Sequence, residues 1–336
     1  MAKSEKAEKA PQAQNAGAAS NPQPQLKKLC DNIYVFYSPT NAGVAAFKAP
    51  DGVAELYFVD ACETLEDAKK LMDACGREFG DFRLKAVIFT HAHADHIGGA
   101  AWLKQKTSCQ IWASQAEKSC AETPQIQAQA FYGGDPIPEI DIPYFHAPQV
   151  FVDRVIAAGQ KISIGGGPGD GGLEFEFVAL PGHSLEMLGI LTAAGGKKVF
   201  FSGDGIFGRH MLNRFWTPFI IDIKAFKESI LRVEKIKADY YVPSHGESYE
   251  RIEELCELNL ISTLSNEKFI EGLLNEPRTL EDLLKLFCDK SGIKLKPSQF
   301  MLIGGTLRSY LTYLYKEGRA KWYFEENKMY WQKVAE

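Results

Sequence analysis

The chain has 336 residues, which is enough for one large domain or for one domain with a small addition. Its 38 Lys and Arg against 43 Asp and Glu give a formal charge of −5, which excludes a positive surface over the whole molecule for nucleic acid and leaves only a local basic patch open. No apolar run is long enough to cross a bilayer, so we expect no membrane-spanning segment.

Seven cysteines are scattered through the chain and form no C-x-x-C pair. This pattern indicates neither a disulfide framework nor a thiolate zinc site, and a reducing cytoplasm fits it best. Residues 1–25 are rich in Ala, Lys, Gln, Asn and Pro and contain almost no large apolar side chain, so we expect a disordered tail. They lack the apolar core of a secretory signal, while their basic start leaves a targeting segment open.

Residues 26–275 are expected to form the main domain, because short apolar runs alternate with amphipathic segments. The run at 84–90 is apolar on both faces, which is typical of a strand covered on two sides, and it ends directly in a histidine. Residues 124–150 combine Pro, Gly and aromatic residues without a period, which predicts a long loop or lid. In chain order, the predicted elements are strands at 33–37, 44–47 and 56–60, a helix at 65–78, strands at 84–90, 161–164, 174–180, 188–191 and 198–201, and a helix at 223–236.

Residues 276–336 are expected to form a small C-terminal domain. Thr279 and Asp282 fit a capping box, and apolar residues then recur on one face of a helix. A second helix follows, and the alternation at 320–324 predicts a strand of a hairpin. Helix, helix and hairpin together suggest a winged-helix-like unit. Residues 277–336 carry 11 Lys and Arg against 7 Asp and Glu, so this unit is basic inside an acidic chain.

The segment at 89–99, FTHAHADHIGG, holds three imidazoles and one carboxylate within six positions, directly after the predicted buried strand. A lone histidine is more often a packed or surface residue than a ligand, but only 7 of 336 residues are histidine and three of them fall here. In an extended turn His91 and His93 project to the same side, so both can bind one ion. Asp95 and His96 can then reach a second ion.

Three further candidate ligands stand at predicted strand ends, each between small residues that allow a sharp turn. They are His183 in Pro-Gly-His-Ser, Asp204 in Ser-Gly-Asp-Gly and His245 in Pro-Ser-His-Gly. Any one of them alone is weak support for a metal site. Two metal ions need more ligands than the first loop supplies, however, and these three complete the set.

With these motifs in this order, the chain resembles the metallo-β-lactamase superfamily over residues 26–275. The resemblance implies an α+β fold, a four-layer αβ/βα sandwich, here followed by the winged-helix-like unit. Asp60 matches the family's aspartate at the end of an early strand, which supports the metal loop without binding metal. By the same resemblance, one metal is held by His91, His93 and His183, the other by Asp95, His96 and His245, and Asp204 bridges them.

The chemistry that the resemblance implies is metal-dependent hydrolysis. Two cations about 3.5 to 4 Å apart lower the pKa of the water between them, and the resulting bridging hydroxide attacks the substrate. Asp95 is placed to orient this nucleophile or to accept its proton, and Asp204 joins the two ions. Nitrogen and oxygen ligands without a thiolate suit two zinc ions, while iron and manganese accept the same set.

Three reaction classes stay open. The first is hydrolysis of a small ester or thioester, because the metal motifs resemble glyoxalase II-like enzymes; the different C-terminal unit puts the glutathione thioester in doubt. The second is cleavage of single-stranded RNA or another phosphodiester, because that unit resembles the winged helix of lactamase-like endoribonucleases. The third is a mono-iron dioxygenase of the persulfide type, although the complete second ligand set favours a dinuclear hydrolase. A secreted β-lactamase is not expected without a secretory signal.

Candidate substrate contacts are Tyr132 in the predicted lid and the neighbours Arg209 and His210. An exposed histidine is more often a plain surface residue, so these three are hypotheses only. The expected partner is a small molecule. Single-stranded nucleic acid and a second copy of the chain, bound through the C-terminal unit, are the alternatives.

Overall fold

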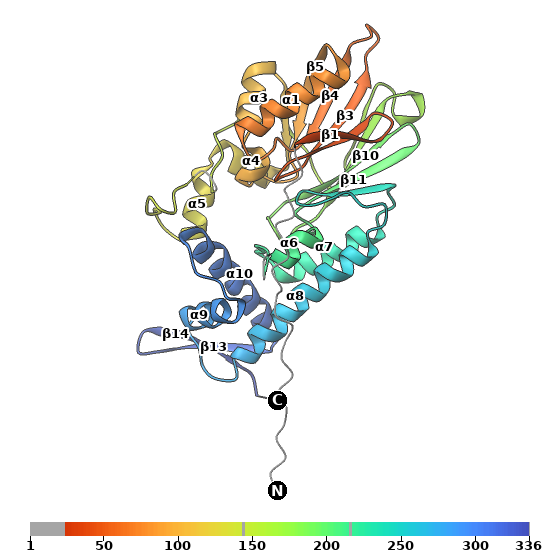
Figure 1. Cartoon of the computed structure of the whole chain (residues 1–336). Helices are drawn as coiled ribbons and strands as arrows, with labels where there is room; N and C mark the ends of the chain where they lie inside the picture. The colour runs from red at the N-terminus through yellow and green to blue at the C-terminus, as the bar shows by residue number, and fades with distance from the viewer. Residues whose placement is uncertain (1–23, 143–144, 215–216, 336) are drawn as a thin grey trace.

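Two β-sheets form the centre of the molecule (Figure 1), which the computed structural model describes over residues 24–142, 145–214 and 217–335. The first sheet has the strand order β1 to β7, and the second has the order β12-β11-β10-β9-β8. The strands of the first are β1 (Gln25–Cys30), β2 (Ile33–Tyr37), β3 (Ala42–Lys48), β4 (Ala54–Val59), β5 (Phe82–Ile88), β6 (Gln110–Ala113) and β7 (Arg154–Val155). Those of the second are β8 (Lys161–Ile164), β9 (Leu173–Ala179), β10 (Leu188–Ala194), β11 (Lys197–Gly203) and β12 (Tyr240–Pro243).

Helices cover the outer faces of both sheets, so the predicted four-layer sandwich is confirmed (Figure 1). Among the described residues, none of the helices combines the length and the hydropathy that a transmembrane segment requires. The helices are α1 (Leu65–Phe79), α2 (Ala94–Ile97), α3 (Ala100–Thr107), α4 (Gln115–Glu122), α5 (Gln125–Tyr132), α6 (Arg209–Arg214), α7 (Ile223–Lys235), α8 (Glu253–Leu273), α9 (Leu280–Ser291) and α10 (Pro297–Lys316), with a 3-10 turn at Pro168–Asp170.

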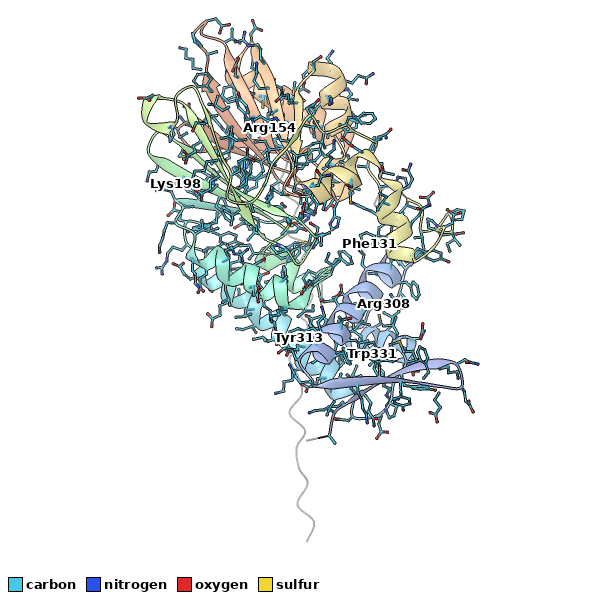
Figure 2. The ribbon with its side chains drawn as sticks, turned by 180° about the vertical axis from the view of Figure 1, so that it is seen from behind. Phe131, Arg154, Lys198, Arg308, Tyr313 and Trp331 are labelled. Carbon is cyan, nitrogen blue, oxygen red and sulfur yellow. The ribbon has the colours of Figure 1, made fainter. Side chains whose placement is uncertain are left out.

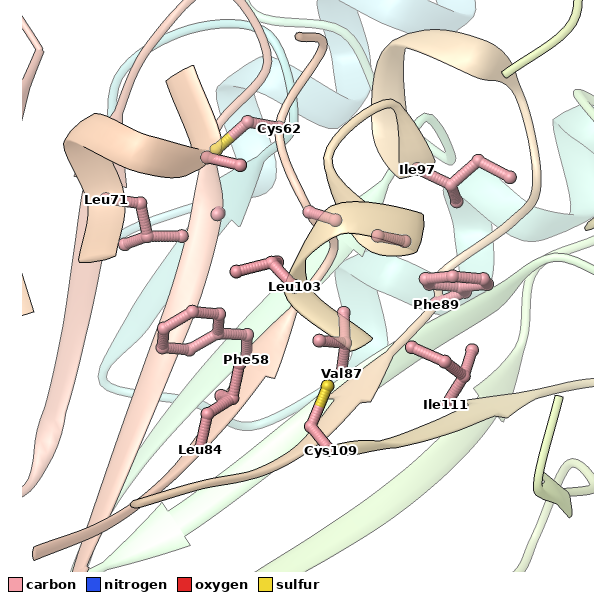
Figure 3. Close-up of a cluster of buried hydrophobic side chains, with 14 of the residues drawn as sticks. Phe58, Cys62, Leu71, Leu84, Val87, Phe89, Ile97, Leu103, Cys109 and Ile111 are labelled. Atoms are coloured by element: carbon pink, nitrogen blue, oxygen red, sulfur yellow. The ribbon is translucent and has the colours of Figure 1, made fainter. Parts of the chain in front are cut away.

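Strand β4 shows how the layers are built, because its alternate side chains point to opposite faces of the sheet. Phe58 packs with Leu71 of α1 and Leu103 of α3 in the cluster drawn in Figure 3. Tyr57 and Val59 belong instead to the cluster between the two sheets. A strand buried on both faces reads as a continuous apolar run, and this explains why the central strands are visible in the sequence.

Strand β1 corrects the predicted tail at one residue, since the strand already begins at Gln25. Pro24 is described without regular secondary structure, and residues 1–23 of that prediction lie outside the described part of the chain. The sequence did not predict β1, because this edge strand is mostly exposed and carries a single buried residue, Leu29. An exposed edge strand has little of the apolar alternation on which strand prediction rests.

Helix α5 corrects the predicted loop at 124–150. Pro124 precedes its first turn, and Gly133 ends it in the left-handed conformation with φ of 81°. The helix buries Gln127 and Ala128, a polar and a small residue. An amphipathic period of large apolar residues is therefore missing, and the segment looks like a loop in sequence although it is helical.

The predicted helix, helix and hairpin of the C-terminal segment are present as α9, α10 and the two-stranded sheet of β13 (Ala320–Glu325) and β14 (Lys328–Lys333). Leu283 of α9 and Tyr310 of α10 share one hydrophobic cluster with Phe226 of α7 and Leu255 of α8. The C-terminal segment is thus packed onto the helices that cover the second sheet. Its likeness to a winged helix and the domain boundary at 275/276 stay predictions.

The strand ends position the functional residues at one edge of the sandwich. Strands β4 and β5 are parallel neighbours and lead into Asp60 and His91, respectively. Strands β11 and β12 of the other sheet are also parallel and lead into Asp204 and His245. The carboxyl ends of parallel strands meet at the same edge, where ligand sites of such sheets commonly form.

The inter-sheet cluster gives a stability prediction. Phe177 is fully buried between the sheets, so we expect Phe177→Ala to lower the free energy of unfolding by about 3 to 5 kcal/mol. Urea denaturation of the purified protein measures this. The matched control is Phe151→Ala, because Phe151 is 62% exposed and its loss should change stability by less than about 0.5 kcal/mol. Equal losses for the two variants would contradict the packing described.

Candidate metal centre

Three imidazoles meet at the end of β5. His91 Nε2 lies 3.0 Å from His93 Nδ1, and His183 Nε2 lies 2.8 Å from the same atom. Three ring nitrogens at such separations are close enough to share one cation. We call His91, His93 and His183 the first ligand group.

Hydrogen bonds made by Nδ1 orient the rings of His91 and His183 so that their Nε2 atoms point toward the other histidines of the group. His183 Nδ1–H donates to the carbonyl of Phe219 at 2.7 Å, which leaves Nε2 as an acceptor. Thr90 donates its hydroxyl to Asp60, so its Oγ1 can accept from His91 Nδ1 at 3.1 Å. Outer partners of this kind fix the tautomer and orientation of metal-binding histidines.

The second ligand group consists of Asp95, His96 and His245. His96 Nδ1–H donates to Asp60 Oδ2 at 2.9 Å, and His245 Nδ1–H donates to the carbonyl of Pro39 at 2.9 Å. The Nε2 atoms of these two rings therefore face inward, where Asp95 Oδ2 lies 3.3 Å from His245 and 3.7 Å from His96. One ligand atom from each of these three side chains lies within 4.8 Å of the other two, which is close enough for all three to bind one metal ion.

Asp204 stands between the two groups. Its Oδ2 lies 3.4 Å from His183 Nε2 in the first group and 3.5 Å from His245 Nε2 in the second. Its Oδ1 lies 3.5 Å from His96 Nε2. A carboxylate in this position can bind two cations at once. All seven residues predicted as ligands are thus brought together, with Asp60 behind them.

The donor set fits a divalent cation. Within the described residues, His96 Nε2 and Asp204 Oδ1 are buried and have no hydrogen-bond partner. Leaving such atoms unsatisfied costs free energy, and a cation between them removes that cost. Imidazole nitrogens and carboxylate oxygens without a thiolate suit zinc, iron or manganese.

Burial and charge divide the histidines into two kinds. Burial lowers the pKa of His93 to about 3 and also lowers that of His183, so both rings are neutral with a free lone pair. For His96 burial acts in the same direction, but the charges of Asp95 and Asp204 outweigh it and raise the pKa to about 10. A cation entering the second group would displace this proton, so metal binding should release protons.

Two clamps on Ala92 were missed by sequence reasoning. The buried Glu117 of α4 accepts the backbone N–H of Ala92 at 2.8 Å and the hydroxyl of Ser184 at 2.7 Å, which ties the histidine loop to the His183 loop. Gln127 of α5 donates to the carbonyl of Ala92 at 2.7 Å. Neither belongs to a motif. The one sequence signal is that Glu117 shares a helical face with the buried Ala121.

A cavity of about 1040 Å³ opens onto the metal residues. Of the three candidate substrate contacts, His210 lines it. Arg209 forms an ion pair of 2.6 Å with Glu254, and neither it nor Tyr132 is among the described lining residues. The neighbour of Tyr132, Phe131, lines the cavity instead. Another hollow of about 760 Å³, around Arg83 where β5 begins, lies at the opposite edge of the sheet.

The family model of the metallo-beta-lactamase superfamily matches residues 59–245, which is more than half of the chain. The chain belongs to the metallo-beta-lactamase superfamily. The matched range contains Asp60 and all seven candidate ligands.

Comparison with curated proteins identifies partial relatives. The chain is 33% identical to hydroxyacylglutathione hydrolase GloC of Haemophilus influenzae over 128 residues. This matched region covers 38% of this chain and 52% of that protein. A hydroxyacylglutathione hydrolase of Pseudomonas entomophila is 29% identical over 124 residues, 37% of this chain and 34% of that one. The match thus spans about half or less of the length of these relatives.

Solved structures show a likeness over nearly the whole chain. A beta-lactamase domain protein from Burkholderia ambifaria has a TM-score of 0.71 at 16% identity and covers 94% of this chain and 97% of its own. A metallo-beta-lactamase family protein from Thermus thermophilus has a TM-score of 0.65 at 17% identity, and the likeness covers 93% of this chain and 97% of that one. At these identities the likeness shows the fold alone.

The Glu117 clamp can be tested by Glu117→Gln. Oε2 accepts the backbone N–H of Ala92, and Oε1 accepts both the Ser184 hydroxyl and the backbone N–H of Glu186, so an amide NH₂ in either position faces a backbone N–H that cannot accept, and the contact between the two ligand loops is weakened. We expect metal affinity, measured by competition with a chelator, to fall about 10- to 100-fold. Glu122→Gln on the same helix is the control, because Glu122 bonds Lys118 and Val152 instead. An equal change in both variants would exclude a specific role.

The raised pKa of His96 gives a pH prediction for metal-free protein. A group whose pKa rises from 6.5 to about 10 on folding stabilises the fold fully below pH 6.5, and this contribution is lost as the pH rises through 10. Thermal denaturation of chelator-treated protein should therefore show a falling Tm across this range. Metal-loaded protein, in which a cation replaces the proton, should show a smaller fall. A Tm of the metal-free protein that stays constant would contradict the pairing of His96 with the carboxylates.

Proposed function

We propose that this protein hydrolyses a small ester or thioester at a two-metal centre. The observation that carries the proposal is the meeting of two ligand groups at Asp204, beside a cavity large enough for a small-molecule substrate. When bound, two divalent cations would supply a water of lowered pKa and polarise the substrate carbonyl.

The residues of the chain supply the remaining steps. Asp95 lines the cavity, so its carboxylate can orient the attacking water and hold the proton that the water gives up. Asp204 keeps the two ligand groups together. His210 lines the same cavity and is the candidate contact for the substrate carbonyl or its leaving group.

The charges of the cavity support a small substrate over a nucleic acid. Lys27 is the only Lys or Arg among the described residues that line the cavity. The carboxylates of Glu63 and Glu247 line it as well. Binding of a phosphate backbone relies on several Lys or Arg side chains. One cation of the basic C-terminal unit, Arg319, is held in ion pairs with Glu267 and Glu271.

The relatives point to a thioester. The curated proteins that the chain partly matches are named hydroxyacylglutathione hydrolases, and their substrate name denotes a thioester of glutathione. Glutathione carries two carboxylates, and a single lining lysine offers little to bind them. The proposal is therefore a thioester or ester whose leaving group has fewer negative charges.

Metal analysis and a substrate screen test the proposal together. Protein purified without added metal should contain near two equivalents of zinc and hydrolyse a small thioester, and His93→Ala should reduce kcat/KM by at least about 100-fold. His146→Ala is the control, because His146 bonds Asp141 at 2.8 Å and is not among the described cavity residues. One equivalent of iron without hydrolysis would favour a persulfide-type dioxygenase. Cleavage of single-stranded RNA but of no thioester would contradict the substrate class.

A further inference from the structure

The cavity is divided chemically into two halves, with the metal residues at their border. One half is lined by the N-terminal strands and the His245 loop and is polar; it includes Lys27, Ser38, Thr40 and Glu247. The other half is lined by α5, the segment before α7, and the N-terminal half of α10. It is mainly apolar, and its lining includes Phe131, Phe207, Phe219, Leu302 and Ile303.

The apolar half directly adjoins the first ligand group. The ring centroid of Phe131 lies 6.1 Å from that of His93, and Phe219 lies 5.9 Å from both His93 and His183. Phe131 and Phe219 are also in edge contact, with centroids 5.0 Å apart. An apolar group attached to a carbonyl at the metal centre would therefore touch these two rings.

The wall behind these rings is packed and can hold a fixed shape. Phe131 stands against Phe145 at 5.8 Å, and Phe145 shares a small buried cluster with Ala128 of α5 and Met301 of α10. Figure 2 shows Phe131 on α5 near the end of α10. The wall thus joins the lactamase-like domain to the C-terminal segment.

Helix α10 also holds the backbone segment that carries Phe219. Thr306 Oγ1 accepts the backbone N–H of Ile220 at 3.2 Å, and Ser309 Oγ donates to the carbonyl of Ile221 at 3.0 Å. The segment that carries Phe219 is thus fastened to α10 at the two residues that follow this ring. Its position depends on the C-terminal helix.

The polar half lies at the second ligand group, since the carbonyl of Pro39 holds His245 and Glu63 is close enough to Asp95 for the two charges to interact. In thioester hydrolysis the acyl C–S bond breaks, water supplies the new C–O bond, and the sulfur departs with a proton derived from that water. The leaving group develops negative charge, which the ammonium group of Lys27 can stabilise, whereas the acyl chain develops none. The halves therefore differ in which part of the substrate they suit.

We propose that the substrate is a thioester or ester with an apolar acyl group, which binds between α5 and α10 against Phe131, Phe219 and Leu302. This inference rests on the proposed function, because it assumes that an acyl carbonyl is attacked at the metal centre. It assigns to the C-terminal segment a part in substrate selection.

The acyl chain can be tested with two thioesters of one small polar thiol, acetyl- and octanoyl-N-acetylcysteamine. We expect the metal-loaded wild type to show a kcat/KM for the octanoyl substrate at least about tenfold above that for the acetyl substrate. Phe131→Ala and Leu302→Ala should each lower this ratio about tenfold with metal content retained. Ile126→Ala is the matched control, because Ile126 is an exposed residue of the same helix α5 and should leave the ratio unchanged.

A binding measurement separates this inference from the proposed function. Isothermal titration of metal-free protein with 1-octanol should detect binding that Phe131→Ala and Leu302→Ala weaken and Ile126→Ala does not. If octanol binds in this way but no thioester is hydrolysed, the apolar subsite stands and the proposed reaction is wrong. If both thioesters are hydrolysed equally well and the variants leave the ratio unchanged, the proposed acyl subsite is wrong and the reaction stands.

Discussion

One buried carboxylate, Asp60, holds both halves of the metal centre. It accepts the backbone N–H and the hydroxyl of Thr90, each at 2.8 Å, and Nδ1–H of His96 at 2.9 Å. Through Thr90 it orients His91 of the first group, and through His96 it reaches the second. A buried charge needs such donors to be tolerated at all. Asp60 adopts a left-handed backbone with φ of 61°, which a residue other than glycine rarely does, so the chain accepts local strain at this position.

The seven ligands could be predicted from sequence because each stands in a short motif at a strand end, and buried strands are visible as apolar runs. Apart from Asp60, the residues that orient them could not. Glu117 and Gln127 lie 25 and 35 residues from Ala92, which they contact only through its backbone, and Phe219 lies 36 residues from His183. Such contacts follow from the packing of helices onto the sheets and leave no local pattern.

Two of the elements that escaped prediction, β1 and α5, share a physical cause. Strand β1 lies at a sheet edge and helix α5 buries a glutamine and an alanine, so neither carries the large apolar residues at regular spacing that identify strands and amphipathic helices. The substrate contacts show the same limit. The lid was expected to act through Tyr132, but it is the adjacent Phe131 that faces the cavity, since one step along a helix turns the side chain by about 100°.

The hydrogen bonds of Thr306 and Ser309 affect more than the wall of the cavity. They hold the backbone at 220–221, next to the carbonyl of Phe219 that orients His183. The C-terminal helix therefore helps to position a candidate metal ligand and the apolar wall of the cavity through the same few atoms. A chimaera that exchanged this helix for that of another lactamase-fold protein would alter metal binding and substrate range together, because residues 26–275 do not form the whole candidate site on their own.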